Sequence, residues 1–193
     1  MMENSNDTRG INALEFLEHK HDEIDELFSQ FEEIKDNGDD TQKEELVARI
    51  CEELTIHAKI EETIFYPAAR RAVQEQGQEL LDEAAVEHQT LKDIVGRLEM
   101  APTSDPLYDA GVKVLSEYTK HHVREEENEL FPKVRQTNLD LQALGQQLAE
   151  RQQELESQDQ RTSQNGRTRG TAQRGQGTGS RGSMSESRSR STH

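Results

Sequence analysis

The sequence predicts an all-α protein: an antiparallel up-down four-helix bundle, followed by a short C-terminal fifth helix and a disordered tail. Between residue 12 and about residue 156, apolar residues recur at intervals of three and four in four long segments and one shorter one. The alternating Val, Ile and Thr runs typical of strands do not occur there. Short turn-forming stretches separate the segments, and such short connections favour antiparallel neighbouring helices.

The first two helices are predicted from their caps and apolar stripes. Asn12 and Glu15 form a capping box that begins the first helix, which ends near residues 36–38, and Thr41 with Glu44 is predicted to begin the second. Polar residues interrupt both stripes. The first stripe is Leu14, Leu17, His21, Ile24, Phe28 and Phe31; the second is Val47, Ile50, Leu54, His57, Glu61, Ile64 and Ala68.

The remaining helices follow the same rule. The third is predicted after the break at residues 74–77 and stops before Pro102, and the fourth begins near Asp105 and Pro106 and ends near Pro132. The fifth is predicted from Leu139 to about Glu154. The stripes are Leu81, Ala84, His88, Leu91, Val95 and Leu98; then Leu115, Tyr118, His122, Glu126 and Leu130; and, in the fifth helix, Leu141, Leu144 and Leu148.

Charge and composition divide the chain into three predicted regions. Residues 1–10 are expected to be a disordered N-terminus, 11–157 the folded domain and 158–193 a disordered basic tail rich in Arg, Gly and Ser, because the tail lacks apolar residues to bury. Residues 1–150 carry a net charge of −20, whereas 151–193 carry +4. The acidic domain is therefore not expected to bind nucleic acid. The tail's partner stays open: nucleic acid, a membrane surface, the acidic domain, or solvent alone.

Two further observations concern the compartment. The sequence has no run of about 18 apolar residues and no basic segment followed by an apolar one at its N-terminus, so neither a membrane span nor a secretory signal is expected. The single cysteine, Cys51, fits a reducing environment and excludes an internal disulfide. A cytoplasmic location is predicted, and any metal chemistry must use His and carboxylate ligands.

An internal repeat places these ligands at one level. The pattern His57-x3-Glu61-Glu62-x4-Pro67 recurs as His122-x3-Glu126-Glu127-x4-Pro132, and a lone His precedes each copy by 36 and 34 residues. Residues at the same height in an antiparallel pair are symmetric about the turn, and the midpoints of His21 with His57 and of His88 with His122 fall in the predicted turns. Four histidines are therefore expected to meet in the core.

A buried group of imidazoles and carboxylates predicts a metal centre. His and Glu at positions i and i+4 lie on one helix face, so the second and fourth helices can each offer both groups to one point. Ligands without thiolate suit iron or manganese, with zinc less favoured, and two Glu between helices can bridge two ions. Without a cation these buried groups would cost several kcal/mol for each charge. The candidate ligands are His21, His57, Glu61, His88, His122 and Glu126.

This pattern, with the runs EETIFYP and EENELFP, resembles hemerythrin-like proteins with an HHE cation-binding domain, over about residues 11–150. The resemblance implies a non-haem di-iron centre with oxo or hydroxo and carboxylate bridges, the six candidates as ligands, and Glu61 and Glu126 as bridges. The sequence departs from the oxygen carriers, which have a His-x3-His pair on the third helix, because here Lys92 lies four residues after His88 and Ala84 four residues before it. Oxygen carriage is therefore not expected.

The predicted function is a di-iron protein whose open metal site reacts with or senses oxygen, peroxide or nitric oxide. Peroxide decomposition is one form of this activity, and no site for an organic substrate is visible. The alternative is an iron-holding or oxygen-sensing module without turnover, and a third is an interaction bundle with a degenerate site. These hypotheses differ in whether metal is bound and whether peroxide is consumed.

Several further residues are predicted to lie outside the site. His19 lies on the opposite face of the first helix from His21, His121 breaks the repeat that His122 completes, and His193 lies in the tail. For three glutamates, contact with the ligands from outside is the alternative to a solvated face, and the solvated face is favoured. For the aromatic residues, shielding of the metal from water is the alternative to a place in the core, and the core is favoured. These are Glu62, Glu125 and Glu127, with Phe28, Phe31, Phe65, Tyr66 and Phe131.

Overall fold

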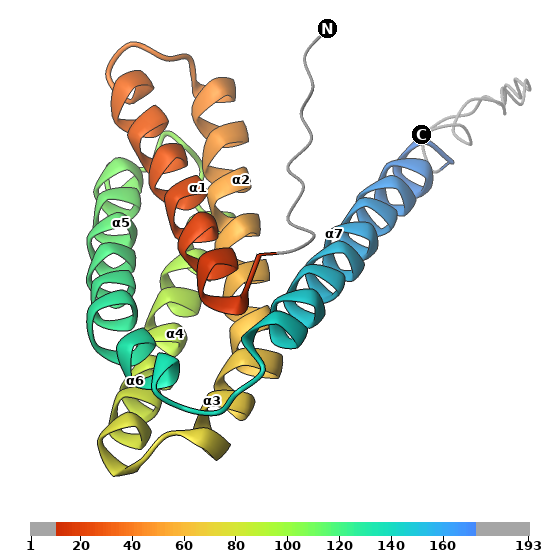
Figure 1. Cartoon of the computed structure of the whole chain (residues 1–193). Coiled ribbons are helices and arrows are strands. Elements are labelled where there is room, and N and C mark those ends of the chain that lie inside the picture. Colours follow the sequence, from red (N-terminus) through yellow and green to blue (C-terminus); the bar gives the residue numbers. More distant parts are fainter. Residues whose placement is uncertain (1–10, 173–193) are drawn as a thin grey trace, which may run out of the picture. The chain divides into compact units, whose positions relative to one another are not determined.

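A computed structural model describes residues 11–172 of the chain (Figure 1). The described residues form helices only, and the predicted all-α bundle is confirmed. The predicted disordered N-terminus, 1–10, and residues 173–193 of the predicted tail lie outside the described residues. The elements in order are α1 (Ala13–Ile34), α2 (Asp40–Ile60), η1 (Glu61–Phe65), α3 (Tyr66–Ala72), α4 (Glu75–Met100), α5 (Tyr108–Glu125), η2 (Glu126–Leu130), α6 (Phe131–Arg135) and α7 (Leu141–Ala172).

Four long helical rods form the bundle. Two of them are α1 and α4, and the other two are the continuous runs α2–η1–α3 and α5–η2–α6. The first rod, α1, packs against α2, and α4 packs against α5. Each of these pairs is a hairpin joined by a short connection, and in Figure 1 the four rods lie side by side. The chain thus folds as two helix hairpins that bury their apolar stripes against each other.

Of the two capping boxes predicted from the sequence, one is confirmed and the other is wrong. Asn12 accepts hydrogen bonds from the amides of Leu14 and Glu15, and the Glu15 carboxylate accepts one from the Asn12 amide, as predicted. The predicted capping box of Thr41 and Glu44 is wrong. Asp39 and Gln42 form it instead, because Asp39 has the extended backbone that a cap requires and its side chain accepts from the Gln42 amide at 2.8 Å.

A π-helical turn occurs at the same place in both hairpins. The amide of Tyr66 donates to the carbonyl of Glu61, five residues earlier, and η2 contains the equivalent bond to Glu126. Each turn precedes a proline, whose ring would clash with the carbonyl four residues before it and which has no N–H to offer. The wider turn relieves that clash, and such turns are frequent at functional sites.

The π turns shift the apolar stripe that a regular helix would have. Ile64, predicted to be in the core, is only partly buried, and the fully buried residue is Phe65. The predicted position of Tyr118 is also wrong, since its side chain is 47 % exposed and Thr119 is buried in its place. The stripes of the first and third predicted helices are confirmed, because all their residues are buried.

Two apolar clusters fill the bundle, one on each side of the histidine level. Toward one end the core includes Leu14, Leu17, Phe65, Leu81 and Phe131, and toward the other Ile24, Phe28, Phe31, Ile50 and Leu115. The four candidate histidines lie between these clusters along every rod. The metal-binding candidates therefore occupy a polar layer inside an otherwise apolar core.

The fifth helix docks as predicted but runs further. Leu144 and Leu148 are buried in the first cluster, and Leu141 packs against it. The helix continues to Ala172, so its predicted end near residue 154 is wrong, and residues 158–172, predicted to be disordered, are helical. The chain divides into two units between Glu156 and Ser157, and the helical continuation belongs to the second.

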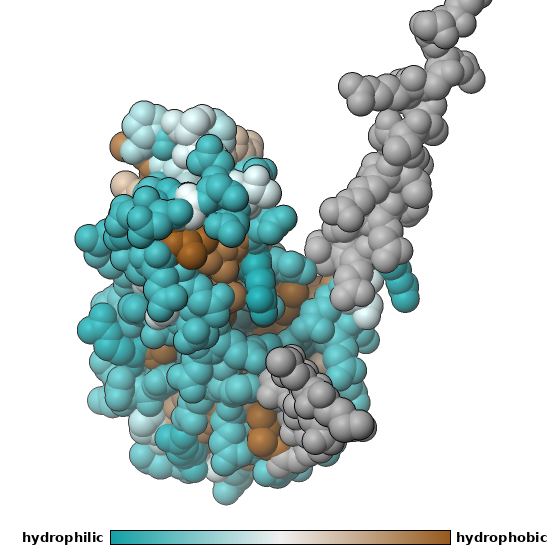
Figure 2. Space-filling view, turned by 90° about the horizontal axis from the view of Figure 1, so that it is seen from above, coloured by the Kyte–Doolittle hydropathy of each residue, from teal (hydrophilic) through white to brown (hydrophobic). Residues whose placement is uncertain are grey.

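The surface of the bundle agrees with its acidic composition. Figure 2 shows a face covered largely by hydrophilic side chains, with apolar ones visible in small patches. Among the helices within residues 11–172, none is long and apolar enough to cross a membrane. Cys51 is a free, buried thiol in the second apolar cluster, and burial raises its pKa to about 12.

Candidate metal centre

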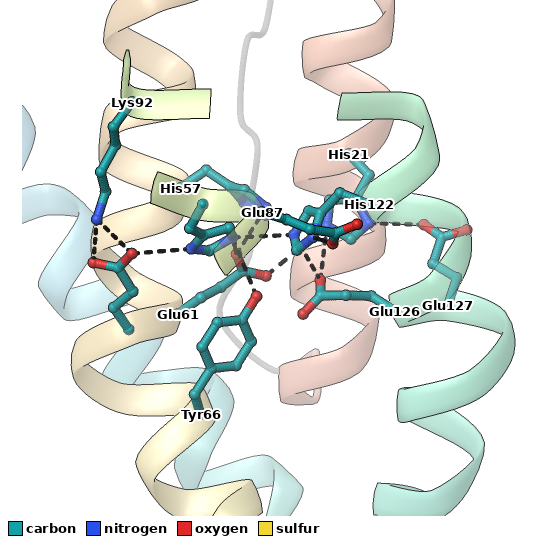
Figure 3. A network of polar contacts seen from close by, with 11 residues as sticks. His21, His57, Glu61, Tyr66, Glu87, Lys92, His122, Glu126 and Glu127 are labelled. Atoms are coloured by element: carbon teal, nitrogen blue, oxygen red, sulfur yellow. Dashed lines mark hydrogen bonds and ion pairs between the residues drawn. The ribbon is translucent and has the colours of Figure 1, made fainter. Parts of the chain in front are cut away.

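The six candidate ligands meet in the polar layer, at the centre of the bundle (Figure 3). Every one is buried, with exposed fractions between 0 and 5 %. The hairpin turns place the histidines at one height, and the i, i+4 spacing brings each Glu beneath its own His. The residues are His21 of α1, His57 of α2, Glu61 of η1, His88 of α4, His122 of α5 and Glu126 of η2.

The Nε2 atoms of these histidines and the Oε atoms of these glutamates are close enough to bind the same cations. Nε2 of His57 lies 3.1 Å from Oε2 of Glu61, and Nε2 of His88 lies 3.3 Å from the same oxygen. Nε2 of His21 lies 3.5 Å from Oε2 of Glu126 and 4.0 Å from Oε1 of Glu61. His122 joins through its Nε2, which is 3.9 Å from Oε2 of Glu126.

These atoms form two groups that have one residue in common. Ligating atoms of His21, His57, Glu61 and Glu126 lie within 4.8 Å of one another, and so do those of Glu61, His88 and His122. Glu61 is therefore the carboxylate between the two groups. Glu126 belongs to the first group and approaches the second only at the edge, through His122.

Carboxylates outside the layer hold the two lone histidines from behind. Nδ1 of His21 donates to Glu127 at 2.8 Å, and Nδ1 of His88 donates to Glu62 at 3.1 Å. Each lone histidine is thus held by the glutamate that follows the bridging candidate of the other hairpin. The prediction that Glu62 and Glu127 only form a solvated face is wrong. A carboxylate behind a metal-binding histidine fixes its tautomer and directs Nε2 inward.

A third such contact was not anticipated from the sequence. Nδ1 of His122 donates to Oε2 of Glu87 at 2.8 Å. Glu87 directly precedes His88 in the chain, so the helix directs it sideways toward the neighbouring rod. Lys92, four residues after His88, points outward and donates to both oxygens of Glu62 at 2.5 and 2.7 Å.

Tyr66 is a site residue that the sequence reasoning assigned to the core. It is buried in the first apolar cluster, yet its hydroxyl donates to Nε2 of His88 at 3.2 Å and points into the polar layer in Figure 3. The π turn places residue 66 directly above Glu61, whereas a regular helix would turn it away. In the sequence, the repeat places Phe131 at the position equivalent to Tyr66. In the structure, the Phe131 ring is stacked on that of His21, so both positions contact a histidine of the layer.

The protonation of the layer reflects burial and close charge pairs. Burial opposes protonation of His21, but its contacts with Glu126 and Glu127 outweigh this and raise its pKa to about 10. Burial, together with repulsion from Glu126, raises the pKa of Glu61 well above its usual value. Burial lowers the pKa of both His57 and His88. Protons thus gather at His21 and Glu61 in the metal-free layer.

The donor atoms of the layer fit a cation. Among the described residues, seven of its buried atoms have no hydrogen-bond partner: His21 Nε2, both ring nitrogens of His57, and both oxygens of Glu61 and of Glu126. Nε2 of His88 and Nε2 of His122 also face each other at 3.0 Å. With each Nδ1 donating outward, two lone pairs oppose each other there, and a cation relieves that repulsion. Imidazole and carboxylate ligands suit iron, manganese or zinc.

The other histidines behave differently. His19 is partly exposed and lies 3.4 Å from Glu23 on the surface of α1. His121 is 54 % exposed and lies outside the layer, although it forms a third group with Glu87 and Glu125. His193 lies outside the described residues.

A four-helix bundle with a buried layer of His and Glu donors defines a class of cation-binding helical proteins. The comparisons with known proteins identify the family within that class. Residues 12–134 match the family model Hemerythrin HHE cation binding domain, so the chain belongs to this family and is a metal-binding hemerythrin-like module.

The chain is similar to a curated relative and to a solved structure. The relative is a DNA nickase of Nostoc sp. (strain PCC 7120), 28 % identical over 130 residues, which are 67 % of this chain and 35 % of the relative. The chain therefore spans about a third of that protein's length. The structure is a hemerythrin HHE cation binding domain-containing protein of Mycobacterium kansasii, 27 % identical, with a TM-score of 0.65 over 77 % of this chain and 89 % of that one.

Proposed function

We propose that this chain holds two iron ions in the polar layer and that its metal site reacts with or senses oxygen, peroxide or nitric oxide. The observation that supports this proposal most is that Glu61 belongs to both groups of ligand atoms. A carboxylate shared between two groups, each completed by two histidines, is the arrangement that suits a bridged pair of cations. Manganese and zinc are less favoured occupants of the same donors.

The chain's own residues would hold and orient this pair. His21, His57, Glu61 and Glu126 would hold one ion, and Glu61, His88 and His122 would hold the other. The outer carboxylates Glu62, Glu87 and Glu127 keep three of the histidines in the tautomer that offers Nε2 inward. The bound iron pair supplies one- and two-electron redox chemistry with small oxygen or nitrogen species.

The second group carries fewer protein ligands, and this supports an open position there. Three side chains supply it, against four for the first. The Tyr66 hydroxyl stands at that side of the layer, and once Nε2 of His88 binds a cation instead of accepting its proton, the hydroxyl would be free to donate a hydrogen bond to a small bound molecule. Burial and the nearby Glu126 and Glu61 raise the pKa of Tyr66 well above its usual value, so it stays a donor at neutral pH.

A small pocket reaches the same histidines from outside. It is lined by apolar side chains of α2, α4 and α5, among them Leu54, Leu91 and Val95, and by polar ones, which are Thr55, Lys92 and Thr119 together with His57, His88 and His122. A small pocket of this kind suits a small uncharged molecule such as a diatomic gas or peroxide. Nothing in its size accommodates an organic substrate, which supports the small-molecule proposal. We also place the protein in the cytoplasm, as its single free cysteine favours.

Metal analysis tests this proposal directly. The chain is expected to carry two irons and a near-ultraviolet charge-transfer band, and the His57→Ala, His122→Ala variant is expected to lose both. Retention of full iron in that variant, with helical content unchanged, would refute the assignment. Oxygen evolution from added peroxide then separates turnover from the alternative, an iron-holding or oxygen-sensing module, which would bind iron but leave peroxide unchanged.

A further inference from the structure

A third cluster of potential ligands lies on the outside of the second hairpin. Nε2 of His121 is 3.4 Å from Oε1 of Glu87 and 3.3 Å from Oε1 of Glu125. The three ligand atoms lie within 4.8 Å of one another. His121 is 54 % exposed, whereas the side chains of Glu87 and Glu125 are 15 and 28 % exposed. A cation from solvent can therefore reach all three.

Glu87 connects this cluster to the buried layer. Its Oε1 faces His121, while its Oε2 accepts the hydrogen bond from Nδ1 of His122 at 2.8 Å. One carboxylate thus contacts both the exposed histidine and the adjacent buried one.

A small pocket between α4 and the α5–η2 rod continues the connection inward. Glu87 and Glu125 line it together with His122 and Glu126, and the remaining lining residues are Leu80, Ala84 and Leu130. Glu126 is 2 % exposed, and neither of its carboxylate oxygens has a hydrogen-bond partner among the described residues. A buried carboxylate in the wall of the pocket, whose Oε2 has Nε2 of His21 at 3.5 Å but no hydrogen bond, is electrostatically favourable for a cation that arrives from the surface.

The first hairpin serves as an internal comparison, because the repeat gives it equivalent positions. Lys20 stands where the second hairpin has Glu87, and Ile56 and Ile60 stand where it has His121 and Glu125. Both isoleucines are buried, and Lys20 donates to Glu23. The ligand layer is thus symmetric, but a polar approach to it exists in the second hairpin alone, among the residues that the structure describes.

We propose that Glu87, His121 and Glu125 form an uptake site for a divalent first-row transition-metal cation and pass it through this pocket to His122 and Glu126. The proposal rests on the proposed function for its destination. The donors are one imidazole and two carboxylates, a set that favours such cations over Ca²⁺ or Mg²⁺, which prefer oxygen alone. The cation route is distinct from the pocket that residues of α2, α4 and α5 line around His57 and His88.

The test is the rate at which metal-free protein takes up Co²⁺ and Fe²⁺, followed by stopped-flow absorption. The His121→Ala, Glu125→Gln variant is expected to load about tenfold more slowly, within the range by which local charge changes association rates, and to reach the same final content of tightly bound metal. Glu117→Gln, which removes one exposed charge from the same helix, and His19→Ala are the matched controls and are expected to load as the parent does. Equal rates in all proteins would overturn the proposal.

A second measurement separates this proposal from the proposed function. In the His57→Ala, His122→Ala variant, Co²⁺ titration is expected to show one weaker site that disappears when His121→Ala and Glu125→Gln are added. Absence of that weak site would overturn uptake at the surface. Parent protein that binds cations only at this weak site would refute the buried centre and the transfer step, while leaving the surface cluster as a cation site in its own right.

Discussion

The two helix hairpins carry the same ligands in different surroundings. His21, His57 and Glu61 in the first correspond to His88, His122 and Glu126 in the second, and both hairpins have a π turn after the glutamate. The residues next to the ligands differ: Tyr66 against Phe131, Lys20 against Glu87, and Leu54 against Thr119. The repeat therefore specifies a symmetric set of donors, and the neighbours make the two metal positions unequal.

The two glutamates provide the strongest test of that inequality. Glu61 belongs to both ligand groups and Glu126 to one. Glu61→Ala is expected to lower bound iron from two ions per chain to fewer than one, whereas Glu126→Ala is expected to retain about one. Plasma mass spectrometry of the two variants measures this. Equal metal content in both would show that the carboxylates are equivalent after all.

The carboxylate behind His122 has no counterpart behind His57. Glu87 accepts from Nδ1 of His122, whereas Nδ1 of His57 has no partner among the described residues. Glu87→Gln is expected to weaken binding of one metal ion about 10–100-fold, as loss of an outer partner does in other metal sites. Competition with a metal chelator measures the affinity. Lys20→Gln is the control at the equivalent position and should leave both affinities unchanged.

The lone histidines of the two hairpins also differ in protonation. The pKa of His21 rises to about 10 through its contacts with Glu126 and Glu127, whereas burial lowers the pKa of His88. The folded metal-free protein holds the His21 proton more tightly than the unfolded chain does. Its contribution to stability is therefore fully present below pH 6.5 and is lost as the pH rises through 10.

Metal must displace this proton, so iron affinity is expected to increase by about tenfold per pH unit below pH 10 for each proton released. Urea unfolding of the metal-free protein at pH 6.5 and 8.5, with His21→Gln as control, measures the expected fall in its stability as the pH rises. Proton release on adding Mn²⁺ in weak buffer measures the displacement of the proton by metal. If stability of the parent and the control changes identically with pH, the assignment of the proton to His21 is wrong.

The smallest expected effect comes from exchanging the aromatic pair. Tyr66→Phe removes the hydroxyl that donates to His88 and makes the two hairpins alike. We expect a loss of about 1 kcal/mol in the free energy of unfolding, the typical value of one hydrogen bond, and a shift in the absorption of the iron-loaded protein. Phe131→Tyr, which adds a hydroxyl where Phe131 is fully buried, is expected to cost about 1–3 kcal/mol if no partner accepts it. An unchanged spectrum in Tyr66→Phe would remove Tyr66 from the site.

Most of the architecture could be predicted from the sequence because helices depend on patterns between neighbouring residues. Apolar residues at intervals of three and four predicted the helices of the four rods, and the stripe from Leu14 to Phe31 is buried throughout. The failures are also local in origin. The predicted cap at Thr41 is wrong because the backbone conformation that a cap requires occurs at Asp39, and the sequence pattern does not reveal that conformation. The predicted burial of Ile64 is wrong because its stripe follows a regular helical period, which the π turn interrupts.

The candidate ligands followed from a repeat, but their partners did not. His57 and Glu61 share one helix face at fixed spacing, so their meeting can be anticipated from the chain alone. Glu127 holds His21 from 106 residues away, and Glu87 holds His122 from 35 residues away. Both glutamates belong to charge-rich segments, and nothing in those segments distinguishes a buried contact from a solvated one.

By itself the sequence determined the helical class, the four rods, the level at which His21, His57, His88 and His122 meet, and the family to which the chain belongs. Tertiary structure alone decided that Glu61 stands between two groups of donors, that Tyr66 enters the layer, and that one hairpin has an acidic approach where the other is apolar. The physical reason is the distance along the chain over which each kind of interaction acts. Periodicity and capping act within one helix, whereas the contacts that make the two metal positions unequal depend on how separate rods turn toward one another.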